Sequence, residues 1–140
     1  MGRVLGIDFG EKRCGIALSD PTHCIASAHS VISYRDLAEV YRQVKAQCDE
    51  SEVEKIVVGL PLNMDGSLGP SAQRAQAFAK GLGSRVAVPV TTWDERLSTK
   101  SAVDALIEAG TRRRKRKGIV DKVAAQILLQ HYLDAHTETD

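Results

Sequence analysis

Two near-continuous apolar runs constrain the fold of this 140-residue chain more than any other feature. Residues 3–8 end in the carboxylate of Asp8, which Gly10 soon follows, and residues 55–60 form a second run. Such runs are typical of strands that are covered on both faces of a partly parallel sheet. An acid is costly in apolar packing but tolerated at the carboxyl edge of the sheet, where ligands bind. Asp8 is therefore either a metal-binding carboxylate or a strand-end aspartate that caps a turn.

The rest of the chain predicts three further strands and four helices. The further strands are expected over residues 13–19, 28–33 and 85–92, and the helices over residues 36–50, 71–83, 98–110 and 119–135. Ser71 is a good N-cap for the second helix. Pro89 cannot donate a hydrogen bond, which favours an edge position for the strand that contains it.

The order of these elements predicts an α/β fold in one domain over residues 1–140. Three antiparallel strands followed by two strand–helix units indicate a five-stranded mixed sheet with helices on both faces. With right-handed crossovers and strands numbered along the chain, the sheet order is 3-2-1-4-5.

Composition excludes several classes of protein. Hydrophobic residues make up 43% of the chain and charged residues 26%, which is typical of a soluble globular protein. No apolar run approaches the roughly 20 residues of a membrane span, and no export signal is evident, so we expect a cytoplasmic protein. Cys14, Cys24 and Cys48 are odd in number and lack Cys-x-x-Cys spacing, which argues against a disulfide framework and structural zinc.

Acids stand at the ends of several predicted elements. Asp8 ends the first strand, Asp94 and Glu95 follow the fifth, and Asp121 lies in the first turn of the last helix. Asp121 there would also suit the helix dipole, and Glu95 could be a solvated loop residue. Because neighbouring residues of an extended segment point to opposite sides, Asp94 or Glu95, but not both, would join Asp8. We favour Glu95.

Three clustered carboxylates would resist ionising together unless a cation lay among them. Mg²⁺ or Mn²⁺ is the natural choice, because these hard ions are held by a few carboxylates and by substrate phosphates. Two such ions can promote hydrolysis of a phosphodiester. We therefore expect a metal-dependent nuclease in which Asp8 bridges two ions, while Glu95 and Asp121 each complete one site.

One basic run stands out from an otherwise acidic chain. It comprises Arg112, Arg113, Arg114, Lys115, Arg116 and Lys117, and taking these six from 19 basic residues leaves 13 against 18 acidic residues, a net charge of −5 elsewhere. A loop of this kind can simply be a solubilising surface. Directly before Asp121, it would instead hold a phosphate backbone on either side of the cut. Aromatic residues are only 4% of the chain, which favours recognition of backbone over base stacking.

Several segments together resemble the YqgF (RuvX) family. They are residues 6–10 (GIDFG), 58–66 (VGLPLNMDG) and 94–99 (DERLST), with Asp121 opening the last helix. The resemblance covers nearly the whole chain and implies the RNase H-like fold. Members of the family are described as nucleases that process the 5′ end of precursor 16S ribosomal RNA, and as Holliday junction resolvases by similarity to RuvC. The resemblance also implies that structured RNA or branched DNA is the partner, and that the protein is a monomer or a homodimer.

The resemblance adds residue roles and one departure. Arg96, Ser98 and Thr99, with the loop at residues 59–66, would shape the rim of the site and contact phosphate. RuvC-type resolvases carry their second acid at the end of the fourth strand, whereas this strand ends without a carboxylate. The role of the second acid would therefore belong to Glu95, which follows the fifth strand.

Four functions therefore remain open from the sequence. The first is a nuclease acting on structured RNA, and the second is a four-way-junction resolvase, which requires a dimer. The third is a sugar-kinase or actin-like ATPase, whose phosphate loop resembles residues 7–10 but which needs two such domains. The fourth is a non-catalytic nucleic-acid-binding module for ribosome assembly.

Overall fold

The computed structural model describes residues 2–94 and 113–137, without the side chains of residues 113–121 and 137. The predicted helix at residues 98–110 lies outside these ranges.

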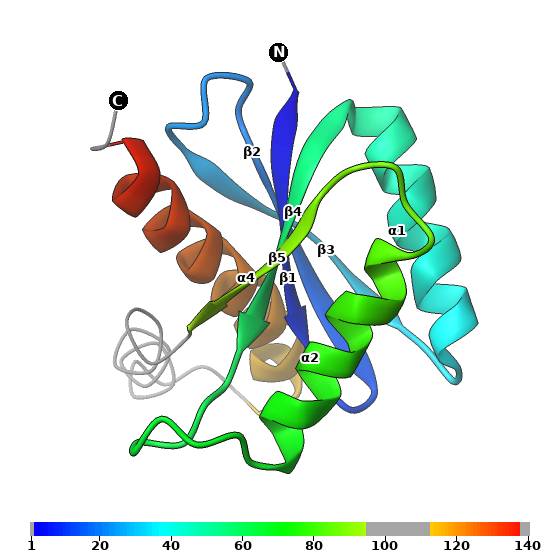
Figure 1. Cartoon of the computed structure of the whole chain (residues 1–140), viewed down its shortest axis with the longest axis vertical. Coiled ribbons are helices and arrows are strands. Elements are labelled where there is room, and N and C mark those ends of the chain that lie inside the picture. Colours follow the sequence, from blue (N-terminus) through cyan, green and yellow to red (C-terminus); the bar gives the residue numbers. More distant parts are fainter. Residues whose placement is uncertain (1, 95–112, 138–140) are drawn as a thin grey trace.

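Five strands form one mixed sheet (Figure 1). They are β1 (Arg3–Phe9), β2 (Arg13–Ser19), β3 (Ala26–Ser33), β4 (Val53–Leu60) and β5 (Val90–Asp94). β2 pairs antiparallel with β1 and β3, whereas β4 pairs parallel with β1 and β5. The predicted order, β3-β2-β1-β4-β5, is confirmed. The carboxyl ends of β1, β4 and β5 consequently lie at one edge of the sheet.

Helices cover both faces of this sheet, as the sequence predicts. The helices are α1 (Leu37–Ser51), α2 (Pro70–Gly83) and α4 (Arg113–Thr137). Leu5 and Ile7 of β1 share a core with residues of α1 and α2, such as Phe78. Val4 instead packs with Leu129 of α4 on the opposite face. The alternation of side chains along a strand thus divides β1 between two apolar cores.

The last helix begins earlier than its apolar pattern predicts. α4 starts at Arg113 rather than near residue 119, so residues 113–117 of the basic run are helical and do not form a loop. Lysine and arginine are good helix formers, which explains how the helix extends through a run of cations. Asp121 consequently does not lie in the first turn, and Arg112 lies outside the described residues.

Two other predicted boundaries are also wrong. β5 begins at Val90 rather than at residue 85, because Pro89 has no amide to donate, although its carbonyl accepts from the Ile56 amide at 2.9 Å. α2 begins at Pro70 with Gly69 at the N-cap, so Ser71 is not the cap. Proline suits the first helical position because its missing amide would lack a partner there in any case.

The three cysteines are free, and Cys14 and Cys48 are buried while Cys24 is exposed. Burial, followed by the neighbouring charge of Asp49, raises the pKa of Cys48 to about 11. No helix among the described residues has both the length and the apolar character that a membrane span requires.

Candidate active site

Asp8 lies near the carboxyl end of the central strand, on the face that α4 covers. Side chains alternate along β1, so Asp8 shares a face with Val4 and Gly6. Val4 packs against α4, and a Cβ built on Gly6 would lie 2.9 Å from the Cβ of Leu129 in that helix. Asp8 itself is half-buried. The structure therefore has this carboxylate at the carboxyl edge of the sheet, as predicted.

Glycines stand beside Asp8 on both neighbouring strands. Gly15 of β2 pairs directly with Asp8. On the other side Ile7 is level with Val58 in the parallel pair, so the next residue of β4, Gly59, is level with Asp8. At the positions level with Asp8, neither adjacent strand therefore carries a side chain. Gly15 is predicted only as a strand residue, and Gly59 as the end of a strand and the start of the rim loop at residues 59–66. Their positions beside Asp8 follow from the register of the sheet.

Asp94 points to the other face of the sheet. Trp93 is level with Gly59 and packs with the α4 core, whereas Asp94 is level with Leu60. Alternation along β5 therefore puts Asp94 on the face of α1 and α2, opposite to Asp8. The structure does not bring these two carboxylates together across one face. Glu95 lies outside the described residues.

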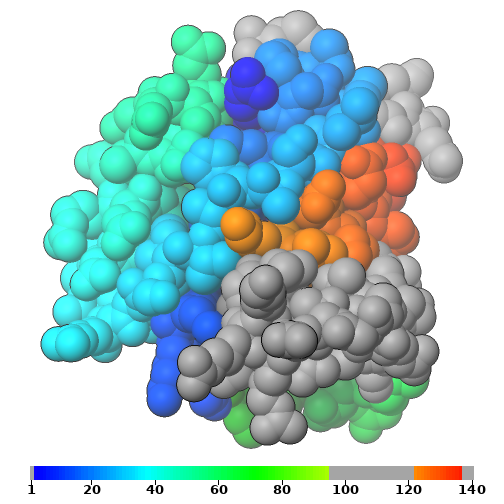
Figure 2. All heavy atoms as spheres, turned by 180° about the vertical axis from the view of Figure 1, so that it is seen from behind, coloured from blue at the N-terminus to red at the C-terminus, as the bar shows by residue number. Residues whose placement is uncertain are grey.

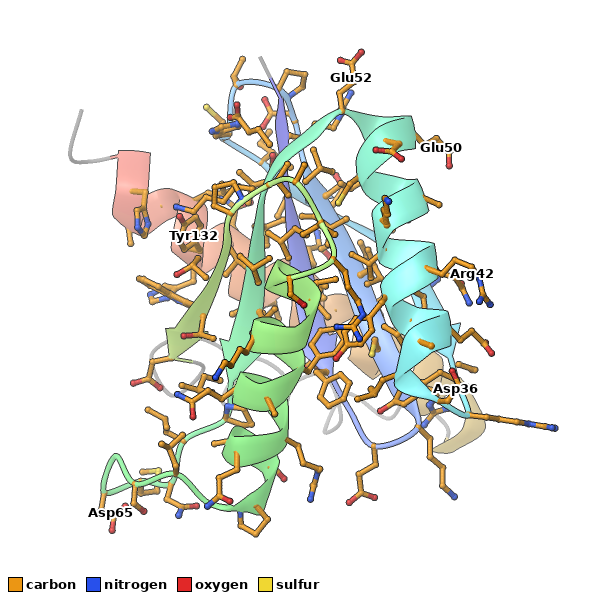
Figure 3. All side chains as sticks on the ribbon, turned by 45° about the vertical axis from the view of Figure 1, so that its right-hand side comes forward. Asp36, Arg42, Glu50, Glu52, Asp65 and Tyr132 are labelled. Atoms are coloured by element: carbon orange, nitrogen blue, oxygen red, sulfur yellow. The ribbon has the colours of Figure 1, made fainter. Side chains whose placement is uncertain are left out.

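Trp93 anchors the end of β5 against α4. Its indole Nε1 donates to Nδ1 of His131 at 3.2 Å, and its ring meets Tyr132 edge-on with 5.3 Å between centroids. Figure 3 shows Tyr132 on the side of α4 that faces the sheet. The sequence around His131 and Trp93 predicts no role for either residue, and no local pattern marks them as partners.

The turn that follows Asp8 is closely packed. The amide of Gly10 donates to the carbonyl of Arg13 at 2.9 Å, and a Cβ on Gly10 would lie 2.7 Å from that carbonyl oxygen. The hydroxyl of Tyr34 donates to the carbonyl of Gly10, and its ring stacks on Phe9 at a centroid distance of 5.9 Å. Burial, and secondarily the charge of Cys14, raises the pKa of Tyr34 to about 12. These contacts hold the backbone beyond Asp8 in place.

The loop after β4 reaches the same edge, because β1 and β4 are parallel. It has its own hydrogen bonds: the Asn63 amide donates to the Ser67 carbonyl at 3.0 Å, and the Ser67 amide donates to Oδ1 of Asp65 at 2.9 Å. Gly66 has φ 88°, a conformation that favours glycine. Figure 3 shows Asp65 near the tip of this loop. The segment predicted to shape the rim is therefore preformed.

The predicted metal ligands are only partly described. Asp121 is a helical residue of α4, but its side chain lies outside the description, as do Glu95, Arg96, Ser98, Thr99 and Arg112. Within the described part of the chain, no three His, Cys, Asp or Glu side chains group as they would around a metal ion. The half-buried carboxylate of Asp8 is chemically suited to a hard cation such as Mg²⁺. The set of Asp8, Glu95 and Asp121 remains a prediction.

Comparison with known sequences identifies close relatives along nearly the whole chain. A family model described as "RuvX: Holliday junction resolvase" matches residues 2–135. A protein of Syntrophomonas wolfei named "Putative pre-16S rRNA nuclease" is 48% identical over 132 residues, or 94% of each chain. A protein of the same name from Halothermothrix orenii is 47% identical, again over 94% of each chain.

Comparison with solved structures finds the same fold. The structure entitled "T. thermophilus RuvC in complex with Holliday junction substrate" matches with a TM-score of 0.62 and 17% identity, covering 99% of this chain and 98% of the other. At that identity the likeness concerns the fold, and it confirms the predicted RNase H-like architecture. The family model and the two relatives establish more, namely that this chain belongs to the RuvX family.

Proposed function

We propose that this chain is a metal-dependent endonuclease that hydrolyses phosphodiester bonds, with Asp8, Glu95 and Asp121 as its catalytic carboxylates. The observation that carries the proposal is the placement of Asp8. A half-buried acid ends the central strand of a RuvX-family fold, on the α4 face, between two glycines. The two glycines add no side chain at the positions level with Asp8, which supports a cation site there.

Strand alternation supports Glu95 as the second acid. Trp93 lies on the α4 face and Asp94 on the opposite one. An extended segment that continued for one more residue would return to the face of Asp8. Glu95 therefore suits the role better than Asp94.

The pitch of α4 supports Asp121 as the third acid. A Cβ on Gly6 would approach Leu129 and the carbonyl of Ala125, and Figure 1 shows α4 beginning where β1 ends. Two residues along a strand advance about 6.6 Å, and four residues along a helix about 6 Å. Asp8 is two residues beyond Gly6, so counting four residues back from the Ala125–Leu129 turn gives residues 121–125 as level with Asp8. Position 121 is at the end of that range.

The three acids would hold two Mg²⁺ or Mn²⁺ ions, with Asp8 shared between them, because clustered carboxylates repel one another without a cation. When bound, such ions supply a hydroxide nucleophile at neutral pH and neutralise charge on the leaving oxygen. The role of the protein is to fix the three carboxylates on one rigid edge. The anchored end of β5 and the packed turn after Asp8 serve this purpose.

We propose precursor 16S ribosomal RNA as the substrate, cut at its 5′ end, because the relatives are named for that activity. Arg96, Ser98, Thr99 and the basic run at residues 112–117 would contact the phosphate backbone. The description of the family model favours a second candidate, the Holliday junction. A resolvase must cut two strands, so this alternative requires a dimer with two active sites.

The test compares two aspartates on opposite faces of the same sheet. Asp8→Asn should abolish Mn²⁺-dependent cleavage of a precursor 16S RNA fragment, whereas Asp94→Asn, the matched control, should retain it. Glu95→Gln should behave like Asp8→Asn. Loss of activity in Asp94→Asn with activity retained in Glu95→Gln would reverse the assignment of the second acid.

A four-way DNA junction treated with the same preparations separates the two substrates. Preferential cleavage of the junction, by a protein that sediments as a dimer, would favour the resolvase. Equal cleavage by the wild type and Asp8→Asn would assign the activity to a contaminant. Binding of RNA without cleavage by any preparation would favour a non-catalytic module for ribosome assembly.

A further inference from the structure

A basic depression lies at the β1–β2 turn, where the connection from β3 to α1 meets it, on the side of β1 away from β5. Its lining includes Glu11, Lys12, Arg13, Tyr34, Arg35 and Glu39, and its volume is about 780 Å³. These residues come from the β1–β2 turn, the end of β3 and the start of α1. Figure 2 shows the blue segment of the β1–β2 turn and the cyan segment at the start of α1 as neighbouring prominences at the lower left of the view.

Backbone hydrogen bonds bring the two halves of this depression together. The amide of Tyr34 donates to the carbonyl of Lys12 at 3.1 Å, and Arg13 pairs with Ser33 across the β2–β3 ladder. Lys12 supplies the acceptor of that first bond, Arg35 directly follows its donor, and both residues are exposed. Cations far apart in the sequence are therefore held side by side by the fold.

The cations of the depression outweigh its acids. Three cations line it against two carboxylates, and Oε1 of Glu11 is already engaged by Arg74 at 3.3 Å. Outside the basic run at residues 112–117 the chain is acidic, so a cationic hollow here is unusual for this surface. A polyanion is the partner that this charge favours.

The aromatic residue in the depression does not serve as a stacking platform. Tyr34 stacks on Phe9, and its hydroxyl is engaged by the Gly10 carbonyl. Contact with bases by stacking needs a ring face that is available. The depression is thus suited to phosphates and not to bases.

We propose that the basic depression binds the phosphodiester backbone of the substrate next to the scissile bond, on the opposite side from the β4–α2 loop. This inference rests on the proposed nuclease function and adds a second contact surface to it. Lys12 is four residues after Asp8 in the chain, a span of about 14 Å at most. That is less than one turn of a duplex, about 34 Å. Asp8 faces α4, whereas Tyr34 packs with the core under α1, so a duplex arm that crosses this end of the sheet would contact both Asp8 and the depression.

The experiment measures binding separately from cleavage. In an Asp8→Asn parent kept in EDTA, Lys12→Gln/Arg35→Gln is compared with Arg42→Gln/Lys80→Gln. Each pair removes one lysine and one arginine from exposed positions, and Figure 3 shows Arg42 projecting outward from α1. The probes are a fluorescent hairpin RNA containing the precursor 16S 5′ duplex and a fluorescent four-way DNA junction. Anisotropy is recorded from 50 to 200 mM salt.

Loss of two backbone contacts should lower the slope of log K against log salt by about 1.8, since each phosphate contact contributes about 0.9. We expect this change, with at least a tenfold loss of affinity, for Lys12→Gln/Arg35→Gln on both probes and not for the control pair. Loss on one probe alone would identify that nucleic acid as the partner of the depression.

Equal affinities and slopes for the two pairs would overturn the inference, as would absence of binding by the parent. If the wild type cleaves RNA and Lys12→Gln/Arg35→Gln binds it as tightly as the parent, the proposed role of the depression is wrong while the proposed nuclease function stands. If only Lys12→Gln/Arg35→Gln loses binding and the wild type cleaves no probe, the proposed nuclease function is wrong while the proposed role of the depression stands.

Discussion

Gly6 and Leu129 make the close approach on which the position of α4 depends. A Cβ built on Gly6 would lie 2.9 Å from the Cβ of Leu129 and 3.5 Å from the carbonyl oxygen of Ala125. Because Leu129 is fully buried, it has no room to move aside. The absence of a side chain at position 6 therefore determines how near the helix that carries Asp121 comes to the strand that carries Asp8.

Gly6→Ala should move α4 away from the sheet and lower the free energy of unfolding by about 1–3 kcal/mol, as overpacking does. If Asp8 and Asp121 act together, the cleavage rate of the fully folded variant should also fall. A misplacement of about 1 Å can cost roughly 100-fold in rate. Urea denaturation gives the stability, and single-turnover kinetics at low temperature give the rate.

A double-mutant cycle with Leu129→Gly tests the cause, because only glycine removes the Cβ that would lie 2.9 Å from the new methyl. Leu129→Gly alone should cost at least the roughly 2–5 kcal/mol of truncating a buried leucine, plus about 1 kcal/mol for glycine within a helix. In the double variant the alanine at position 6 gains space, so the combined loss should be smaller than the sum by about 0.5–3 kcal/mol. Strict additivity would show that the two sites do not compete for volume.

The sequence predicts the sheet well because its determinants are local. The apolar runs of β1 and β4 identify these two as the central strands. The short connection between β1 and β2 fixes the antiparallel pairing of β1 with β2. Pro89 marks an edge strand, and β5 lies at the edge of the sheet. The predicted start of α4 is wrong because a run of cations is compatible with either a loop or a helix, and composition alone does not distinguish the two structures.

The site is predictable only in part, for a related reason. The position of Asp8 could be predicted from the apolar strand that precedes it. The location of Asp94 on the opposite face of the sheet follows from the alternation of side chains along β5. The contacts that support the site join distant residues: Trp93 and His131 are 38 positions apart, and Tyr34 and Gly10 are 24 apart. Nothing in the local pattern around any of these four residues indicates its partner.

Two glycines of α2 should respond to alanine in opposite directions. A Cβ on Gly81 would lie 2.4 Å from the hydroxyl of Tyr41, a buried ring that stacks on Phe78. A Cβ on Gly83 would meet only Val90, at 3.9 Å. Gly83→Ala should therefore stabilise by about 0.5–1 kcal/mol through helix propensity, whereas Gly81→Ala should destabilise.

Thermal unfolding of the two variants checks this contrast, and Tyr41→Phe supplies the control. Removing the hydroxyl leaves the Cζ atom of the ring 3.1 Å from the alanine methyl, so most of the loss in Gly81→Ala should be recovered. Stabilisation by Gly81→Ala in the wild-type background would contradict the clash.

Asp20 should make the protein sensitive to acid. Its carboxylate accepts from the amides of Ile25 and Cys24, at 2.9 and 2.8 Å, and from the Thr22 hydroxyl. The hydrogen bond from Ile25, followed by that from Thr22, holds the pKa of Asp20 well below its usual range. A depressed pKa stabilises the fold above the unfolded value of about 4, and this contribution is lost as pH falls below it.

Asp20→Asn should accordingly lower the urea midpoint at pH 7 and have less effect at pH 3. Asp49→Asn, an exposed position in α1, is the charge-matched control and should not reproduce this dependence. A difference between Asp20→Asn and the wild type that is the same at both pH values would show that the carboxylate charge is not responsible.

Tyr34→Phe tests the hydrogen bond that holds the turn after Asp8. Because the variant keeps the ring that stacks on Phe9 and loses only the donor to the Gly10 carbonyl, unfolding should become easier by about 0.5–1.5 kcal/mol. Burial raises the pKa of Tyr34 to about 12, above the ordinary value of 10.0. For a raised pKa the stabilisation is complete below pH 10 and declines between pH 10 and 12. Urea midpoints of wild type and Tyr34→Phe should therefore converge in that window, and an absorbance titration at alkaline pH should lose one late tyrosinate transition in the variant. Midpoints that stayed parallel from pH 7 to 12 would mean that the hydroxyl is solvated like that of any surface tyrosine, and that the turn beside Asp8 is held by other contacts.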